Sequence, residues 1–283
     1  MTMPSFAEAS PPVPMLRTRH PRALPAVDDR RNDDQARGLR QLFGSSTSYR
    51  SVCHLALVAN PHVSDCGGVL ERLGSALCTL GLRTLVVDAA ATSPPAAELA
   101  SFDLRGCIEQ LSPQLSYLAA RGLPLRHVDS RGSAAAWLDA LQLAAPATQV
   151  LLVHADASDL ARLYSRQPVH PLLLVAQDAE SITHAYAALK LLALRRRIPA
   201  FDLLVAQPAA ASAQSRAAAV AERLASCAER FLAASVHDWV ALDPACDVRE
   251  PCDEALLRLL HAHLGGVGDE RRPPAAHAPT FLN

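Results

Sequence analysis

The stretch that most constrains this chain runs from Ser51 to Ala90. It begins with an apolar run over 52–59 and breaks at Asn60-Pro61. Apolar residues then recur at the three- and four-residue spacing of a helix. Gly81 lies where a left-handed residue ends a helix, and another short apolar run follows it. The pattern predicts a strand, a loop, a helix and a second strand.

Short apolar runs and helical patterns alternate along the rest of the chain. Further strands are predicted over 124–128, 149–153, 171–175, 202–205 and 239–242, and helices over 103–118 with a break at Pro113, 133–143, 157–164, 181–195, 213–232 and 254–264. Buried strands that alternate with helices predict an α/β fold, with a mainly parallel sheet covered by helices on both faces.

Composition excludes several classes of protein. The net charge of −1 argues against electrostatic binding to nucleic acid. No apolar run reaches the roughly 18 residues that a membrane span needs, and the N-terminal residues lack a secretion signal. The seven cysteines show no C-x-x-C pair, which is typical of reduced, buried thiols. We therefore expect a cytoplasmic protein.

Four segments are expected along the chain. Residues 1–32 are rich in proline and predict a disordered tail, and residues 265–283 predict a second tail without an amphipathic membrane helix. Residues 51–264 form the α/β domain. Between them, 33–44 predicts a short amphipathic helix, which either docks in a partner's groove or lies on its own domain.

The loop after the first predicted strand has the position of a phosphate-binding loop but different chemistry. Phosphates favour the free N–H groups and the dipole at a helix N-terminus, together with a lysine. Here Pro61 lacks an N–H group and Asp65 adds negative charge, while the only lysine of the chain is Lys190. A plain structural turn is favoured over residual nucleotide binding through Gly67 and its neighbour.

Two segments resemble the MinD/ParA-type ATPases, namely 51–90 and 171–192. They look most like the FlhG/FleN regulators of flagellar number, whose corresponding helix reads SITDAYALIK against SITHAYAALK at 181–190. The same regulators carry an N-terminal D-Q-A-x-x-L-R motif, and the resemblance covers roughly 33–264. The motif is matched by Asp34, Gln35, Ala36, Leu39 and Arg40.

The resemblance implies an ATP and magnesium site whose residues are changed here. The loop K-G-G-V-G-K-T of the family falls on 61–67 and loses both lysines and the threonine. The second carboxylate of its D-x-D falls on an alanine, the aspartate of its D-T-P-A-G on a histidine, and its adenine-reading asparagine on Ala206. The degenerate positions are Pro61, Asp65, Cys66, Gly67, Asp88, Ala90 and His154. We therefore expect no ATP cofactor and no catalysis.

Single residues in this region leave alternatives open. Asp88, the first carboxylate of the D-x-D, is either a remnant of a magnesium shell or a cap for nearby backbone N–H groups. His154 with Asp156 suggests acid/base chemistry or a metal site, but an inherited position explains the pair better. His261 and His263 lie on different faces of a helix, so no shared metal is predicted.

The resemblance also implies partners. The N-terminal motif of the family docks onto FlhF, an SRP-type GTPase, and stimulates its GTP hydrolysis. Leu39 with Ala36 would form the apolar face of the docking helix, and Asp34, Gln35 and Arg40 its polar contacts. The α/β domain would bind flagellar switch or C-ring proteins, or a transcriptional activator of flagellar genes. Relatives dimerise around ATP, so a monomer is expected here.

Two alternatives remain beside this non-catalytic regulator of flagellar assembly. One is an active MinD-type ATPase with an unconventional phosphate loop, which would bind ATP with magnesium. The other is a MinD-like accessory protein of another secretion system, such as cellulose synthesis. Neighbouring genes would separate the last case from a flagellar role.

Overall fold

The computed structural model of the protein describes residues 52–207, 211–247 and 253–265. The predicted N-terminal tail (1–32), the predicted docking helix (33–44) and the chain beyond residue 265 lie outside these ranges. Within them, every helix is too short or too polar to cross a lipid bilayer.

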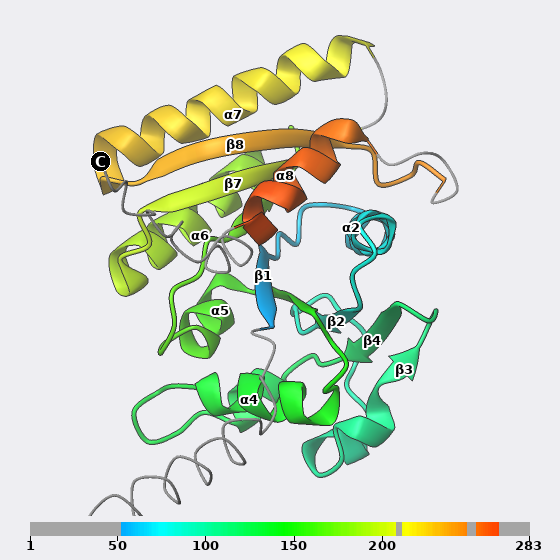
Figure 1. The fold of residues 1–283 in the computed structure, drawn as a ribbon. Coiled ribbons are helices and arrows are strands. Elements are labelled where there is room, and N and C mark those ends of the chain that lie inside the picture. The colour runs from blue at the N-terminus through cyan, green and yellow to red at the C-terminus, as the bar shows by residue number, and fades with distance from the viewer. Residues whose placement is uncertain (1–51, 208–210, 248–252, 266–283) are drawn as a thin grey trace, which may run out of the picture. The chain divides into compact units, whose positions relative to one another are not determined.

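The described strands form one sheet of eight (Figure 1). Their order is β3-β4-β2-β5-β1-β6-β7-β8, and the neighbouring pairs are parallel except β3 with β4. The strands are β1 (Cys53–Val58), β2 (Thr84–Asp88), β3 (Glu109–Gln110), β4 (Leu115–Ala119), β5 (Val150–Ala155), β6 (Leu172–Val175), β7 (Ala200–Ala206) and β8 (Ser235–Leu242). The mainly parallel α/β fold predicted from the sequence is confirmed.

Helices cover both faces of the sheet. The apolar side chains of α2 (Cys66–Thr79) and α8 (Glu254–Gly265) pack against one face, and those of α4 (Ala135–Ala144), α5 (Ala157–Leu163), α6 (Ala179–Arg196) and α7 (Ala211–Leu232) against the other. Strand β1 shows why both faces are apolar. Leu55 and Leu57 join the core beneath α2, whereas Ala56 and Val58 alternate with them and join the core beneath α5 and α6.

The first unit of the chain follows its sequence pattern closely. Helix α2 ends at Thr79, and Gly81 adopts the left-handed conformation with φ of 74°. An added side chain there would be strained by the backbone whatever space surrounds it. The turn returns the chain to β2, so the carboxyl ends of β1 and β2 point to the same edge of the sheet.

Two predictions about secondary structure are wrong. Residues 103–118 are not an α-helix: they contain the short 3₁₀ turn η2 (Arg105–Cys107), then β3 and most of β4. Another 3₁₀ turn, η1 (Glu98–Ser101), precedes them. Strand β4 pairs with β2 along its whole length, and this pairing with a distant segment outweighs the local helical pattern.

The predicted strand over 124–128 is instead the short helix α3 (Leu123–Arg126). Gly122 precedes it with φ of 78°, and Pro124 occupies its first turn. Proline suits that position because the first turn of a helix has no carbonyl partner for its N–H groups. The sequence therefore contained a helix-start signal that outweighs the apolar run.

Candidate functional site

The first candidate site lies where β1 passes into α2, at the carboxyl edge of the sheet. Asp65 caps α2: its Oδ1 accepts a hydrogen bond from the backbone N of Gly68 at 2.8 Å. A carboxylate at this position satisfies a free N–H group and interacts favourably with the helix dipole. The chain thus supplies its own anion where a phosphate-binding loop would receive one.

A segment that follows β8 covers the same helix N-terminus. An added Cβ on Gly68 would lie only 2.2 Å from the carbonyl oxygen of Pro244, so the segment approaches the helix closely. One turn further on, the buried Arg72 donates from Nη1 to the carbonyl oxygen of Asp247 at 3.2 Å. The absence of a side chain at Gly68 therefore allows the segment after β8 to contact the N-terminus of α2 closely.

Replacing Gly68 with alanine is expected to destabilise the protein by about 1–3 kcal/mol, because the new methyl group would overlap the Pro244 carbonyl and Asp65 Oδ2. Gly67→Ala is the matched control. Its Cβ would meet Asp65 Oδ1 at 3.6 Å, an ordinary contact, and alanine favours a helix over glycine by up to about 1 kcal/mol. Urea unfolding measures both variants, and equal losses would contradict the close approach.

Asn60 joins the loop after β1 to the start of α6. Its buried side-chain amide donates to the carbonyl oxygens of Leu174 and Ser181, both at 3.0 Å, and to Ser181 Oγ at 2.9 Å. Ser181 Oγ also accepts from the backbone N of Ala176 at 2.7 Å. These bonds fix the position of the chain after β1 relative to β6 and the start of α6, beside the candidate site.

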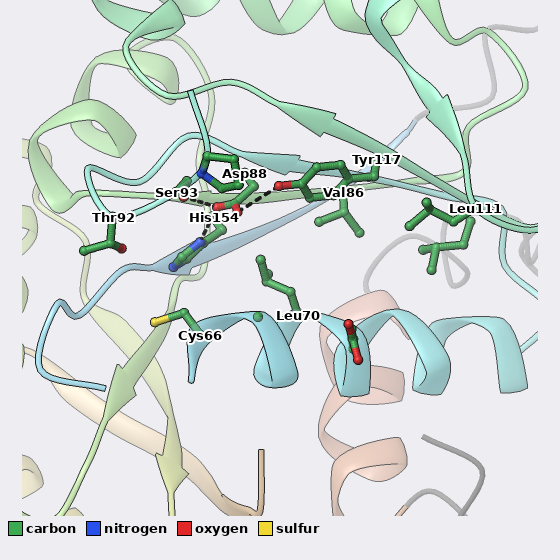
Figure 2. A pocket seen from close by; sticks show the side chains of 13 residues that line it. Cys66, Leu70, Val86, Asp88, Thr92, Ser93, Leu111, Tyr117 and His154 are labelled. Atoms are coloured by element: carbon green, nitrogen blue, oxygen red, sulfur yellow. Dashed lines mark hydrogen bonds and ion pairs between the residues drawn. The ribbon is translucent and has the colours of Figure 1, made fainter. Parts of the chain in front are cut away.

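Asp88, at the end of β2, is the centre of a buried hydrogen-bond cluster (Figure 2). It accepts from His154 Nδ1 at 2.7 Å, from the Tyr117 hydroxyl at 3.1 Å and from the Ser93 hydroxyl. The sheet register explains the first bond, because β2 pairs with β5 so that Asp88 lies opposite His154. The hydrogen bonds described for the Asp88 carboxylate come from side chains, whereas the cap considered from the sequence would have used backbone N–H groups.

Electrostatics in this cluster favour a charged carboxylate. Burial alone would raise the pKa of Asp88, but the hydrogen bonds from His154, Ser93 and Tyr117 outweigh it and hold the pKa below its usual value. Burial and the nearby Asp88 charge raise the pKa of Tyr117. Burial, Asp88 and Asp65 raise the pKa of Cys66 to about 11, so this thiol stays protonated and unreactive at neutral pH.

A cavity of about 350 Å³ lies between this cluster and α2. Leu70 and Cys66 face it from α2, and Asp88 and His154 face it from the strands (Figure 2). The described hydrogen bonds give His154 Nε2, a buried atom, no partner. The walls are mostly apolar, with no lysine or arginine among the lining residues of this cavity. Such a site lacks the positive charge that a triphosphate requires.

Comparisons with known proteins identify the fold. No protein-family model and no curated protein sequence matches the chain. The solved MinD cell division protein of Aquifex aeolicus aligns with a TM-score of 0.52 and 12% identity, over 76% of this chain and 97% of that one. The MinC:MinD cell division protein complex of the same organism aligns with a TM-score of 0.51 and 13% identity, over 80% of this chain and 100% of that one. This chain has a MinD-like fold. At such identities the likeness establishes the fold alone.

Within the MinD-like fold, the predicted site residues fall into three groups. Pro61, Asp65, Cys66 and Gly67 lie together in the loop and first turn of α2. Asp88 and His154 are brought into contact, while Ala90, two residues after Asp88, is buried and has no polar side chain. The motif residues Asp34, Gln35, Ala36, Leu39 and Arg40 lie outside the described ranges.

One alternative and one expectation about this region can be compared with the structure. His154 contacts Asp88, which the sheet register places opposite it, and this contact rather than a pair with Asp156 is the ion pair described for His154. The described cysteines form no disulfide bond with one another and are only half-buried, where buried thiols were predicted.

Sequence reasoning missed four polar residues of the site. Tyr117 was not predicted as a site residue because its segment was predicted as a helix. Ser93 was not predicted because it lies in a turn-rich connection. Asn60 was interpreted only as part of the break after the first apolar run, and Ser181 only as a helix residue. A polar residue directly after a buried strand was the available signal for Asn60, since ligands and polar networks gather at the carboxyl ends of parallel strands.

Proposed function

We propose that this chain is a MinD-like regulator that acts in the cytoplasm by binding other proteins and does not bind or hydrolyse ATP. The observation that carries the proposal is the N-terminus of α2. There Asp65 accepts from the N–H group of Gly68, and the Pro244 carbonyl lies against the same glycine. Both groups are negative or carry a partial negative charge, and they occupy the region that phosphate oxygens would need.

The charge balance supports the same proposal. A nucleotide triphosphate needs cationic side chains or metal ions to offset its charge. The one lysine of the chain, Lys190, is exposed on α6, and the loop supplies Asp65 instead. Asp88 survives from the family's acidic pair, but its carboxylate is engaged by three donors from its own chain. These residues do not fit an ATP–magnesium complex.

Calorimetric titration of the full chain with magnesium and ATP is expected to show no binding heat, while a MinD ATPase under the same conditions gives a saturating signal. A chain variant with the family's loop, K-G-G-V-G-K-T, over 61–67 tests whether the missing residues are sufficient to restore binding. Magnesium-dependent binding by the unchanged chain, lost in Asp88→Asn, would establish the active-ATPase alternative and overturn the proposal.

The surface of the domain offers support for protein binding. Phe102 is 91% exposed and Leu99 is 69% exposed, both at η1, and Leu125 is exposed on the neighbouring α3. Arg126 of α3 donates from Nη1 to Ser101 Oγ at 2.9 Å, which links the two elements. Exposed large apolar side chains on linked elements are typical of protein interaction sites. The candidates remain flagellar switch or C-ring proteins and a flagellar transcriptional activator.

The flagellar part of the proposal rests on the N-terminal motif. We propose that Asp34, Gln35, Ala36, Leu39 and Arg40 engage an FlhF-type SRP GTPase and stimulate its GTP hydrolysis. The motif residues are intact in the sequence although the residues of the ATP site are changed. This contrast favours a role for the motif that does not depend on ATP, and a monomer suffices for it.

GTP turnover by the FlhF-type GTPase of the same organism tests this role. The full chain is expected to stimulate turnover, and Gln35→Ala or Arg40→Ala is expected to return it to the basal rate. Arg37→Ala is the matched control, because it removes a positive charge from the same segment outside the motif. Equal loss in the control, or no stimulation by the full chain, would leave a regulator that works through its α/β domain, such as one of cellulose synthesis.

A further inference from the structure

Three side chains of metal-binding type lie together at the amino edge of the sheet. His170 lies just before β6, Asp202 is in the first half of β7, and His263 is in the last turn of α8. The parallel register pairs Leu172 with Asp202, which places the first two side by side. Asp88 lies at the carboxyl ends of the strands, so this cluster is separate from the candidate site above.

The distances suit a single ion. His263 Nδ1 is 3.1 Å from Asp202 Oδ2, and His170 Nε2 is 3.5 Å from Asp202 Oδ1. All three ligand atoms lie within 4.8 Å of one another. Ligand atoms on a tetrahedral zinc ion with bonds of about 2.0–2.2 Å are about 3.3–3.6 Å apart. Each imidazole nitrogen thus lies at about the required separation from one oxygen of the Asp202 carboxylate. The half-exposed His170 can move to bring its nitrogen onto an ion shared with His263.

The cluster contains polar atoms that its own hydrogen bonds do not satisfy. His170 Nε2 faces Asp202 and is buried without a hydrogen-bond partner. The side chains of Asp202 and His263 are each only 6% exposed. A buried carboxylate between two imidazoles is costly unless a protonated imidazole or a metal ion offsets its charge. Asp202 Oδ1 also accepts from the backbone N of Asp238 at 2.9 Å, which orients the carboxylate as outer contacts orient metal ligands.

The end of α8 favours a bound cation. The carboxyl end of this helix carries partial negative charge, and His263 lies in its last turn. A cation held by His263 would therefore interact favourably with the helix dipole.

We propose that His170, Asp202 and His263 bind one Zn²⁺ ion, or another divalent transition metal that prefers imidazole and carboxylate ligands. The fourth position belongs to water or to His237, whose ring packs edge-on against His170 with centroids 5.4 Å apart. The ion fastens the carboxyl end of α8 to β6 and β7. Because α8 also packs beside α2, the ion stabilises the helix pair on that face of the sheet.

Zinc binding to the full chain, first freed of metal with a chelator, tests the proposal by competition with a chromogenic chelator. We expect one high-affinity ion per chain and a rise in the thermal unfolding temperature on adding zinc. Loss of an outer contact weakens metal sites by about 10–100-fold, so His170→Gln and His263→Gln, which remove ligands, are expected to weaken binding by about 100-fold or more.

His261→Gln is the matched control, because His261 is exposed on the same helix two residues from His263. It is expected to leave zinc affinity and the thermal shift unchanged. His170 is the half-exposed ligand, so His170→Gln is expected to fold even if the buried ligands cannot be replaced. Zinc binding that all variants share equally would place the ion on other histidines or cysteines and overturn the site. Absence of high-affinity zinc binding by the unchanged chain would reduce the cluster to an ion pair.

Discussion

Replacing Asp88 with alanine is expected to lower the free energy of unfolding by about 3–5 kcal/mol at neutral pH. The substitution leaves His154 Nδ1 and the hydroxyls of Tyr117 and Ser93 without their acceptor in a buried site. Unpaired buried donors cost far more than a lost exposed contact. Urea unfolding followed by circular dichroism measures the loss.

Matched substitutions distinguish the loss of the Asp88 hydrogen bonds from an unspecific loss of stability. Tyr117→Phe and Ser93→Ala each remove one donor and are expected to cost about 1 kcal/mol. Asp139→Ala removes an exposed carboxylate of α4 and is expected to stay within about 0.5 kcal/mol. If Asp88→Ala costs no more than Tyr117→Phe, then Asp88 is not the shared acceptor.

The same cluster predicts a pH dependence. The folded protein holds the pKa of Asp88 below its unfolded value of about 3.9, because the three hydrogen bonds outweigh burial. The stabilisation that the Asp88 carboxylate gives to the folded protein is therefore fully present above the unfolded pKa. It is lost as the pH falls through the folded pKa. The stability difference between the unchanged chain and Asp88→Asn is expected to be constant from about pH 7 to 5 and to narrow below about pH 4.

Asn60→Asp is expected to destabilise the protein by about 3–5 kcal/mol at pH 7, although it changes only one atom of the side chain. The amide donates to the carbonyl oxygens of Leu174 and Ser181, each 3.0 Å away. A carboxylate would place a negative oxygen against both carbonyls, in a position that is 1% exposed. Chemical unfolding at pH 7 measures the effect.

Asn60→Ala is the control for this second prediction. It removes the donor without adding charge and is expected to cost about 1–3 kcal/mol. Burial and the two carbonyls would raise the pKa of the new carboxyl group, so Asn60→Asp should recover stability as the pH falls and the group becomes a donor. An Asn60→Asp variant at least as stable as Asn60→Ala at pH 7 would show that Asn60 Nδ2 does not make these bonds.

The order of strands and helices was predictable from the sequence because it depends on local periodicity. The apolar run over 52–59 became β1, and the helical spacing before Gly81 became α2. The two elements that were predicted wrongly, β4 and α3, have local sequences that are compatible with either a helix or a strand. Strand β4 exists because it pairs with β2, and α3 because Gly122 and Pro124 set its first turn.

The sequence by itself also determined what is missing from the loop after β1: the only lysine of the chain is Lys190, so the two lysines of the family's loop are absent whatever the fold. The tertiary structure alone decided what stands there, namely the Pro244 carbonyl against Gly68. It likewise brought His154 to Asp88 through the strand register, and His263 to Asp202 through the path of α8 across the sheet. The reason is physical: periodicity and residue type act over a few neighbours in the chain, whereas these contacts depend on how distant strands and helices pack.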